Sequence, residues 1–216
     1  MRVIAGTFKG RHLVAPKGNR LVRPTTDRVK ESVFSILQER VVDANFLDLC
    51  AGTGNIGIEA LSRGAKHVTF LDREPRCIAV IKKNLHICGL TTESQMYALL
   101  RRDVLKGIVS LHKRAVVFEV IYFDPPYGVG LGNGSQDPLE LYTTSLALLA
   151  ETTLLKIGGV LLVEHARQTD MPDAVGNLCR NRQAHYGDTV VSFYQSENRN
   201  ENLESPIRNT LPDGQR

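Results

Sequence analysis

Residues 47–57 read Leu-Asp-Leu-Cys-Ala-Gly-Thr-Gly-Asn-Ile-Gly, and this stretch decides the fold. An apolar run that predicts a buried strand leads into a glycine-rich turn, and the residues after the turn predict a helix. Glycine at positions 52 and 54 lets the backbone turn sharply and approach a ligand, because a Cβ atom there would collide with it. This order of elements predicts an α/β protein that binds its ligand at the carboxyl ends of the strands.

The glycine turn fits two classes of cofactor, and a nearby acid favours one of them. Residues 52–57 match the GxGxxG pattern of dinucleotide-binding proteins, and Asp72 follows about 20 residues later, where an acid binds the ribose of either cofactor. Asp48 would repel the pyrophosphate of NAD(P) but attract the cationic amino-acid end of S-adenosylmethionine. Asp103 is placed to accept a hydrogen bond from the adenine amino group; a lone Asp before a helix is more often a helix cap, and Asp103 could do both. We expect the S-adenosylmethionine site to comprise Asp48, Ala51, Gly52, Thr53, Gly54, Asp72, Arg73, Asp103 and Val104.

Strand and helix patterns alternate along the rest of the chain. Helices are expected at residues 27–40, 56–62, 75–85, 104–111 and 139–149. Seven strands are expected at residues 46–49, 67–71, 96–100, 117–123 and 160–163, near residue 185 and at 189–194. The alternation predicts a Rossmann-like α/β fold with a mostly parallel seven-stranded sheet and helices on both faces.

The chain divides into three expected parts. Residues 1–40 form a basic extension, in which residues 2–4 and 12–14 pair as a small hairpin before the first helix. Residues 41–195 form the α/β domain, within which Gly158-Gly159 marks a turn before a strand. Residues 196–216 lack a periodic apolar face, so we expect a polar, flexible tail.

A second motif, Asp124-Pro125-Pro126-Tyr127, follows a strongly apolar expected strand, which places it at the same sheet edge as the glycine turn. Two prolines fix φ and leave backbone carbonyls free to accept hydrogen bonds. The Asp124 carboxylate and the Pro125 carbonyl could accept both protons of an exocyclic amine and orient its lone pair toward a methyl sulfonium. Tyr127 offers a ring on which a base can stack. These four residues are the expected catalytic loop, for which a dehydrogenase has no use.

Composition excludes several classes of protein. No apolar run approaches the ~18 residues needed to cross a bilayer, and the N-terminus has no signal-peptide pattern, so we expect a cytoplasmic protein without membrane contact. The four cysteines lack metal-ligand spacing, so we expect neither a disulfide framework nor a bound metal; they are Cys50, Cys77, Cys88 and Cys179. We expect a monomer.

Positive charge is concentrated at the N-terminus. Residues 1–30 contain eight Lys or Arg residues against one acid, Asp27, whereas the whole chain carries only +4. Such a segment attracts phosphates and releases their counterions, although a solvated surface is an equally good interpretation of charge alone.

Taken together, these motifs resemble the RsmD-type bacterial methyltransferases. The resemblance lies in residues 2–6, 9–11, 23–31, 47–54, 57–65 and 124–127. It implies a class I S-adenosylmethionine-dependent fold and methylation of guanine N2 in small-subunit (16S) ribosomal RNA, without a metal. It also implies that the basic segment contacts ribosomal RNA or the small ribosomal subunit, and the expected RNA-binding residues are Arg2, Lys9, Arg11, Arg23 and Arg28. The stretch 128–138 is longer and richer in glycine than the family pattern.

Three other functions remain open at this point. An N6-adenine methyltransferase on DNA or RNA would use the same Asp-Pro-Pro-Tyr motif, because the motif serves any exocyclic amine. A non-catalytic RNA-binding assembly factor would keep the fold, and a NAD(P) dehydrogenase would use only the GxGxxG match. His165 could act as a base at a strand end, although a surface or core histidine is the more common case.

Overall fold

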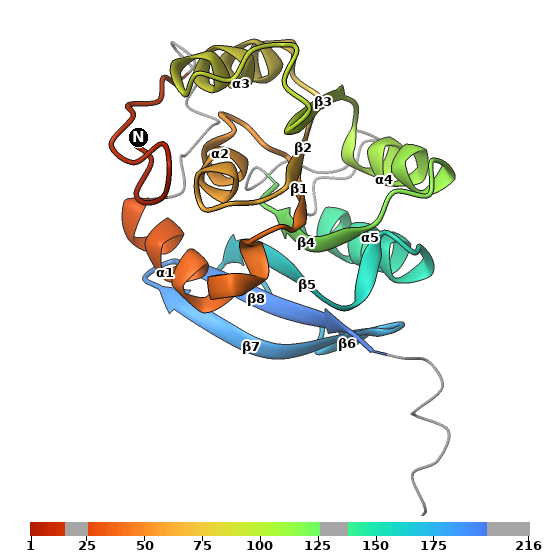
Figure 1. Ribbon diagram of the computed structural model, residues 1–216. Helices are drawn as coiled ribbons and strands as arrows, with labels where there is room; N and C mark the ends of the chain where they lie inside the picture. Colours follow the sequence, from red (N-terminus) through yellow and green to blue (C-terminus); the bar gives the residue numbers. More distant parts are fainter. Residues whose placement is uncertain (16–25, 126–137, 198–216) are drawn as a thin grey trace, which may run out of the picture.

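The alternating pattern becomes one eight-stranded sheet in the computed structural model, which describes residues 1–15, 26–125 and 138–197 (Figure 1). The strand order is β3-β2-β1-β4-β5-β8-β7-β6. The first five strands along the chain pair in parallel and are β1 (Asn45–Leu49), β2 (His67–Asp72), β3 (Tyr97–Arg101), β4 (Phe118–Phe123) and β5 (Leu155–Ala166). The order reverses between β1 and β4, and the crevice outside such a reversal is where open α/β sheets bind ligands.

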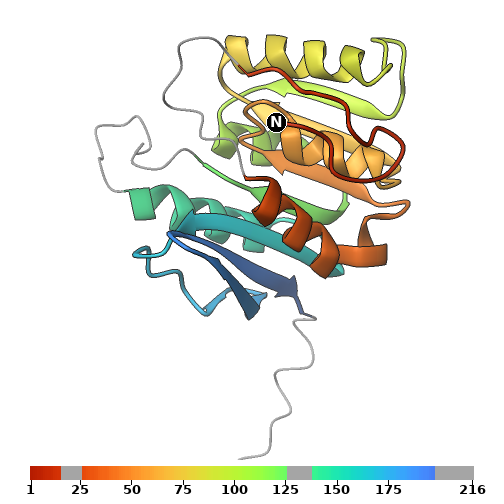
Figure 2. The ribbon, with the colours of Figure 1, turned by 90° about the vertical axis from the view of Figure 1, so that its left-hand side faces the viewer.

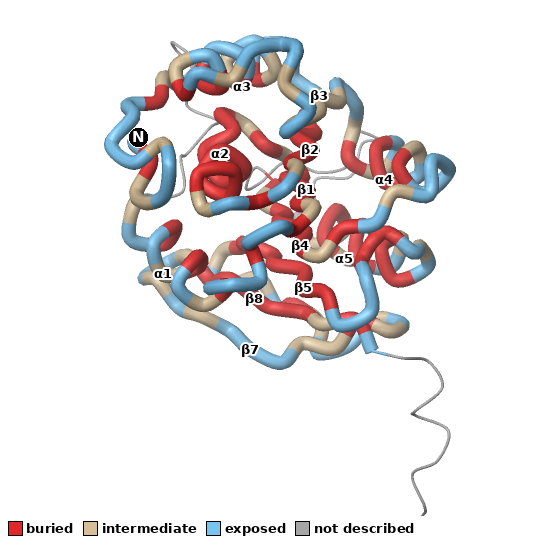
Figure 3. The backbone as a smooth tube through the Cα atoms, viewed as in Figure 1, coloured by how far each residue is buried: buried red, intermediate tan, exposed pale blue. Residues whose placement is uncertain are grey.

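Helices cover both faces of the sheet, as the alternation predicts. They are α1 (Asp27–Leu37), the 3-10 helix η1 (Gln38–Val41), α2 (Asn55–Ser62), α3 (Pro75–Ile87), α4 (Val104–Lys113) and α5 (Pro138–Glu151). One apolar core joins α1, α2 and α3 to one face, and a second joins α4 and α5 to the other. Every residue of α2 is buried, so this helix lies fully inside the molecule (Figure 3).

Three antiparallel strands complete the sheet beyond β5. They are β6 (Ala174–Val175), β7 (Leu178–Tyr186) and β8 (Thr189–Ser196). The two-residue β6 raises the strand number from the expected seven to eight. The expected turn at Gly158-Gly159 lies inside β5, because a register shift against β4 lets the strand continue through the left-handed Gly158 (φ 75°).

The N-terminal segment forms the expected small hairpin and is also held by the helices beside it. Around the antiparallel bridge between Arg2 and His12, the N–H of Val3 donates to the carbonyl of Arg11 and the N–H of Leu13 to that of Met1, both at 3.0 Å. The segment 1–15 runs along α2 and α3 (Figure 2). Ser196, where the flexible tail was expected to begin, is the last residue of β8, and the tail from residue 198 lies outside the described residues, as does most of the glycine-rich stretch 128–138. No helix in the described ranges is long and apolar enough to cross a membrane.

Candidate functional site

The glycine turn between β1 and α2 is built around two left-handed glycines. Gly52 has φ 56° and Gly54 has φ 75°, a region that side chains with a Cβ atom rarely adopt. A Cβ on Gly54 would also lie 3.2 Å from Ile81 and 3.3 Å from Phe70. Two neighbours of these glycines, Ala51 and Thr53, are buried within the turn. The turn therefore keeps its shape without room for larger residues.

Asp48 lies in β1 beneath this turn and is 2% exposed. Its Oδ2 accepts a hydrogen bond of 2.9 Å from the Gly57 N–H, which fastens the strand to the first turn of α2. Burial raises the pKa of Asp48 to about 7, the Gly57 N–H opposes this shift, and the negative charge of Asp72 adds to it. Asp48 thus orders the loop as an acceptor while holding a carboxyl group at the predicted cofactor edge.

Asp72 ends β2 and fixes the turn from the neighbouring strand. Its Oδ2 accepts from the Gly52 N–H and its Oδ1 from the Glu74 N–H, both at 2.8 Å. Burial raises the pKa of Asp72, although these two N–H groups act in the opposite direction. Its neighbour Arg73 is half exposed and forms an ion pair of 3.4 Å with Glu74. The acid that sequence spacing predicts is therefore tied directly to the glycine turn.

Asp103 follows β3 and caps α4, since its Oδ1 accepts from the Leu105 N–H at 3.1 Å. This is the helix-capping alternative considered for this residue, and it leaves the carboxylate at the same edge as the other acids. Val104 is buried in the core beneath α4.

Four aspartates from the ends of four strands gather around Cys50. Burial raises the pKa of the Cys50 thiol well above its usual range, and the negative charges of Asp72, Asp124, Asp48 and Asp103 raise it further. Cys50 itself is left-handed, with φ 62°. The predicted acids thus converge on one site, and such a site attracts a cation. Metal-ligand clusters of three or more His, Cys, Asp or Glu side chains are absent from the described ranges.

The expected catalytic loop starts beside the glycine turn. Asp124 follows β4, and its N–H donates to the carbonyl of Leu49 at the end of β1, with an N···O distance of 3.4 Å. Pro125 is buried. Pro126 and Tyr127 lie outside the described residues.

A buried polar pair, which the sequence patterns missed, lies next to Asp124. The Tyr122 hydroxyl on β4 donates to Glu164 Oε2 on β5 at 2.5 Å, and both residues are buried. Burial raises the pKa of Tyr122 well above its usual range, with Glu164 and Asp124 contributing through their charges. The one available signal was a polar residue at the end of each apolar strand. His165, in contrast, contacts the Ser192 hydroxyl in the core, and burial lowers its pKa.

The expected RNA-binding residues divide between the two ends of the parallel strands, the carboxyl edge that holds the site and the amino edge opposite it. Arg2 is largely exposed and pairs with Asp27 at the start of α1, where Arg28 is also exposed. Lys9 and Arg11 are exposed too, but Arg11 donates to the carbonyl of Ile87 at the end of α3, on the edge away from the site. The remaining candidate, Arg23, lies outside the described residues.

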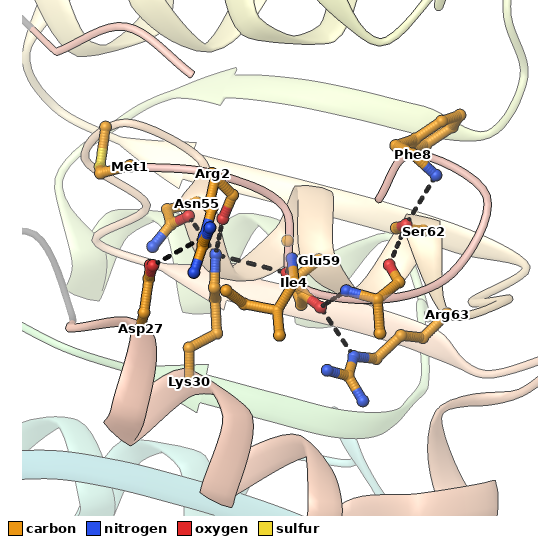
Figure 4. Close-up of polar contacts among 12 residues, drawn as sticks. Met1, Arg2, Ile4, Phe8, Asp27, Lys30, Asn55, Glu59, Ser62 and Arg63 are labelled. Carbon is orange, nitrogen blue, oxygen red and sulfur yellow. Dashed lines mark hydrogen bonds and ion pairs between the residues drawn. The ribbon is translucent and has the colours of Figure 1, made fainter. Parts of the chain in front are cut away.

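A buried network connects the N-terminal segment to the glycine turn (Figure 4). Lys30 Nζ is fully buried and donates to the Arg2 carbonyl at 2.5 Å and to Asn55 Oδ1 at 2.7 Å. It also forms an ion pair of 3.3 Å with the buried Glu59, which accepts from the N–H of Ile4 at 2.8 Å. Asn55 is the first residue of α2, directly after the turn. Lys30, one of the eight cations of the basic segment, is therefore structural.

Comparison with known proteins links this architecture to methyltransferases. The sequence profile of the family described as "Conserved hypothetical protein 95" matches residues 1–195. The chain is 39% identical to "Putative rRNA methyltransferase YlbH" of Bacillus subtilis, over 90% of this chain and 98% of that protein. It is 31% identical to "Ribosomal RNA small subunit methyltransferase D" of Escherichia coli K12, over 91% and 90%. The solved structure of "Putative methyltransferase yhhF" from Escherichia coli superposes with a TM-score of 0.72 and 28% identity, covering 91% and 98%.

Proposed function

Because the chain belongs to the family described as conserved hypothetical protein 95, the RsmD family, we propose that it uses S-adenosylmethionine to methylate the exocyclic N2 of a guanine in small-subunit (16S) ribosomal RNA. The observation that carries this proposal is the convergence of four carboxylates from strand ends around the glycine turn, one of which, Asp124, opens the expected catalytic loop. An rRNA substrate implies a cytoplasmic location, and we propose that the enzyme acts as a monomer.

The described residues fit S-adenosylmethionine. The left-handed turn at Gly52 and Gly54 leaves backbone exposed to a ligand where a Cβ atom would be strained, and the surrounding acids suit a cationic group. In our proposal Asp48 faces the amino-acid end, Asp72 the ribose and Asp103 the adenine, while Ala51, Thr53, Arg73 and Val104 line the site. When bound, the cofactor supplies an electrophilic methyl group.

The protein's own contribution is to hold the amine. Asp124 and the Pro125 carbonyl accept the two amine protons, which directs the nitrogen lone pair out of the base plane toward the cofactor. The proposal gives Tyr127 the role of stacking on the base and assigns Pro126, whose ring fixes φ, to the same loop. After transfer the nitrogen becomes acidic and loses a proton, and Asp124 is the group placed to receive it.

The rRNA contact follows from the basic segment 1–40. We propose that Arg2 and Arg28, which share the site's edge of the sheet, contact phosphates near the target base, together with Arg23. Lys9 and Arg11 would contact more distant phosphates, because they lie toward the other edge.

The test is to identify the methylated nucleoside. Small subunits and naked 16S rRNA from cells lacking this protein are incubated with tritiated S-adenosylmethionine and the pure enzyme, and the digested nucleosides are separated. We expect label in N2-methylguanosine. Label in N6-methyladenosine, or no incorporation into either substrate, would contradict the proposal.

A further inference from the structure

The pair formed by Tyr122 and Glu164 has no role in the scheme above, although it interrupts an apolar core. Glu164 is 5% exposed, and its Oε2 accepts the Tyr122 hydroxyl at 2.5 Å. A buried carboxylate is costly unless hydrogen bonds satisfy it, and apolar side chains usually serve stability better at such positions. A function in the site is therefore the better explanation.

Strand register places Glu164 beside Asp124. Phe123, the last residue of β4, pairs with Val163 of the parallel strand β5, so Asp124 directly follows β4 at the level of Glu164. Side chains alternate along β5, so Glu164 continues the face of Leu162, which shares a core cluster with Tyr122. Burial raises the pKa of Tyr122 and the negative charges of Glu164 and Asp124 both raise it further, which places both carboxylates near its hydroxyl.

Two hydroxyls fix the position of Glu164. The Tyr122 hydroxyl orients the carboxylate from β4, while the Tyr142 hydroxyl of α5 donates to the Glu164 carbonyl at 3.2 Å. A carboxylate accepts several hydrogen bonds, so the bond from Tyr122 still permits another donor. Glu164 is therefore held in one orientation next to the residue that binds the target amine.

The Watson–Crick edges of the two candidate bases differ beside the reacting amine. Guanine presents the N1–H donor next to its N2 amine, whereas adenine presents the unprotonated N1 acceptor next to its N6 amine. A second carboxylate beside Asp124 would accept the N1–H of guanine and repel the N1 lone pair of adenine. We propose that Glu164 is the residue that selects guanine, by accepting its N1–H, and that Tyr122 positions it. This inference rests on the proposed function.

The experiment uses 2-aminopurine, which keeps the exocyclic amine of guanine but lacks the N1–H. The target guanine, once mapped, is replaced by 2-aminopurine in 16S rRNA assembled by splinted ligation. Both RNAs are assayed naked and after reconstitution into small subunits. Wild type, Glu164→Gln and Glu119→Gln are compared by kcat/KM. Glu119→Gln is the matched control, because Glu119 lies on β4 at the opposite edge and pairs with Lys156.

We expect Glu164→Gln to lower the guanine to 2-aminopurine ratio of kcat/KM by at least about tenfold, because the Tyr122 hydroxyl holds the amide oxygen and turns the NH2 donor toward N1. Glu119→Gln should keep the wild-type ratio, and Tyr122→Phe should lower it less than Glu164→Gln does. An unchanged ratio in Glu164→Gln, with guanine still methylated by wild type, overturns this inference alone. Failure of wild type to methylate guanine in either substrate overturns the proposed function and this inference with it.

Discussion

At the scale of single residues, we expect Asp48 to make cofactor binding depend on pH. Burial raises its pKa to about 7, and the negative charge of Asp72 adds to this shift. If the cationic end of S-adenosylmethionine binds there, the ionised carboxylate is favoured and a proton leaves on binding. We expect the affinity to rise up to about tenfold between about pH 6 and pH 8. Isothermal titration calorimetry in buffers of different ionisation enthalpy measures both the affinity and the released proton.

The control for this prediction is Asp48→Asn, which should remove the pH dependence and the proton release. The stability of the fold depends on pH in the opposite direction from cofactor affinity. The Asp48 carboxyl binds its proton more tightly in the folded state than in the unfolded chain. Its protonation therefore stabilises the fold fully below about pH 4, and this contribution is lost as the pH rises to about 7. Proton release that persists in Asp48→Asn would show that another group faces the cofactor.

A substitution of Asp124 separates an effect on cofactor binding from an effect on methyl transfer. Asp124→Ala removes the acceptor that orients the amine, so we expect methyl transfer to rRNA to fall at least about a thousandfold while cofactor affinity changes only a few fold. Asp188→Ala, at an exposed turn between β7 and β8, is the control and should retain full activity. Transfer of tritium and calorimetric cofactor binding are measured on the same preparations. Retained transfer in Asp124→Ala would remove this residue from the site.

At the scale of the elements, Gly57 sets how closely α2 packs on the sheet. A Cβ at Gly57 would lie 2.3 Å from a ring atom of Phe70, whereas one at Gly107 would lie 2.0 Å from a terminal methyl of Leu71. A buried ring cannot move aside, but a leucine methyl can rotate away. We therefore expect Gly57→Ala to destabilise the fold by about 2–3 kcal/mol and Gly107→Ala by less than about 1 kcal/mol, partly offset by helix propensity. Urea denaturation measures the free energy of unfolding of both variants. An equal loss of stability in Gly57→Ala and Gly107→Ala would refute this packing argument.

The N-terminal segment depends on the buried network of Lys30. Lys30→Met leaves Glu59 with Arg63 as its remaining ionic partner, so we expect a loss of about 1.5–3 kcal/mol and faster amide exchange in residues 2–8. Replacing Glu59 as well, as Lys30→Met with Glu59→Leu, should cost more, because the N–H groups of Ile4 and Ala5 then lose their acceptor. Glu31→Met on the exposed face of α1 is the control. Exchange in residues 2–8 that stays at the wild-type rate would show that the network does not hold the segment.

Local sequence patterns predicted most helices and strands, because capping residues, turns and apolar periodicity act over a few residues. The helices after the glycine turn and at residues 104–113 begin at Asn55 and Val104, where a turn or a capping Asp103 starts them. The N-terminal hairpin was confirmed, because backbone hydrogen bonds join Val3 to Arg11 and Leu13 to Met1. Local patterns could not predict that side chains of α2, which are distant in sequence, also hold this segment. The prediction of a turn at Gly158-Gly159 was wrong, because β5 continues through both glycines with a register shift in its pairing with β4.

For the site, the sequence predicted the acids that stand at the ends of successive strands. It did not predict residues that come into contact only because two strands pair side by side. Asp48, Asp72, Asp103 and Asp124 each end or follow a strand, so their convergence on Cys50 was predictable. Tyr122 and Glu164 lie about 40 residues apart in apolar strands, and only the β4–β5 pairing brings them together.

At the scale of the whole molecule, the basic segment separates into two surfaces that a charge count cannot distinguish. Arg28 lies in the first turn of α1 at the site's edge, and Lys9 lies in the turn held by Ser62 at the end of α2, toward the other edge. If the target base enters the catalytic loop, phosphates flanking it pass Arg28 more closely than Lys9. We therefore expect Arg28→Glu to weaken rRNA binding more strongly and to reduce the slope of log affinity against log salt by about 1. Filter binding to small-subunit rRNA across a salt series measures this slope. Lys9→Glu carries the same charge change and serves as the control, so equal slopes for the two variants would mean that charge alone, and not position at the site, governs RNA binding.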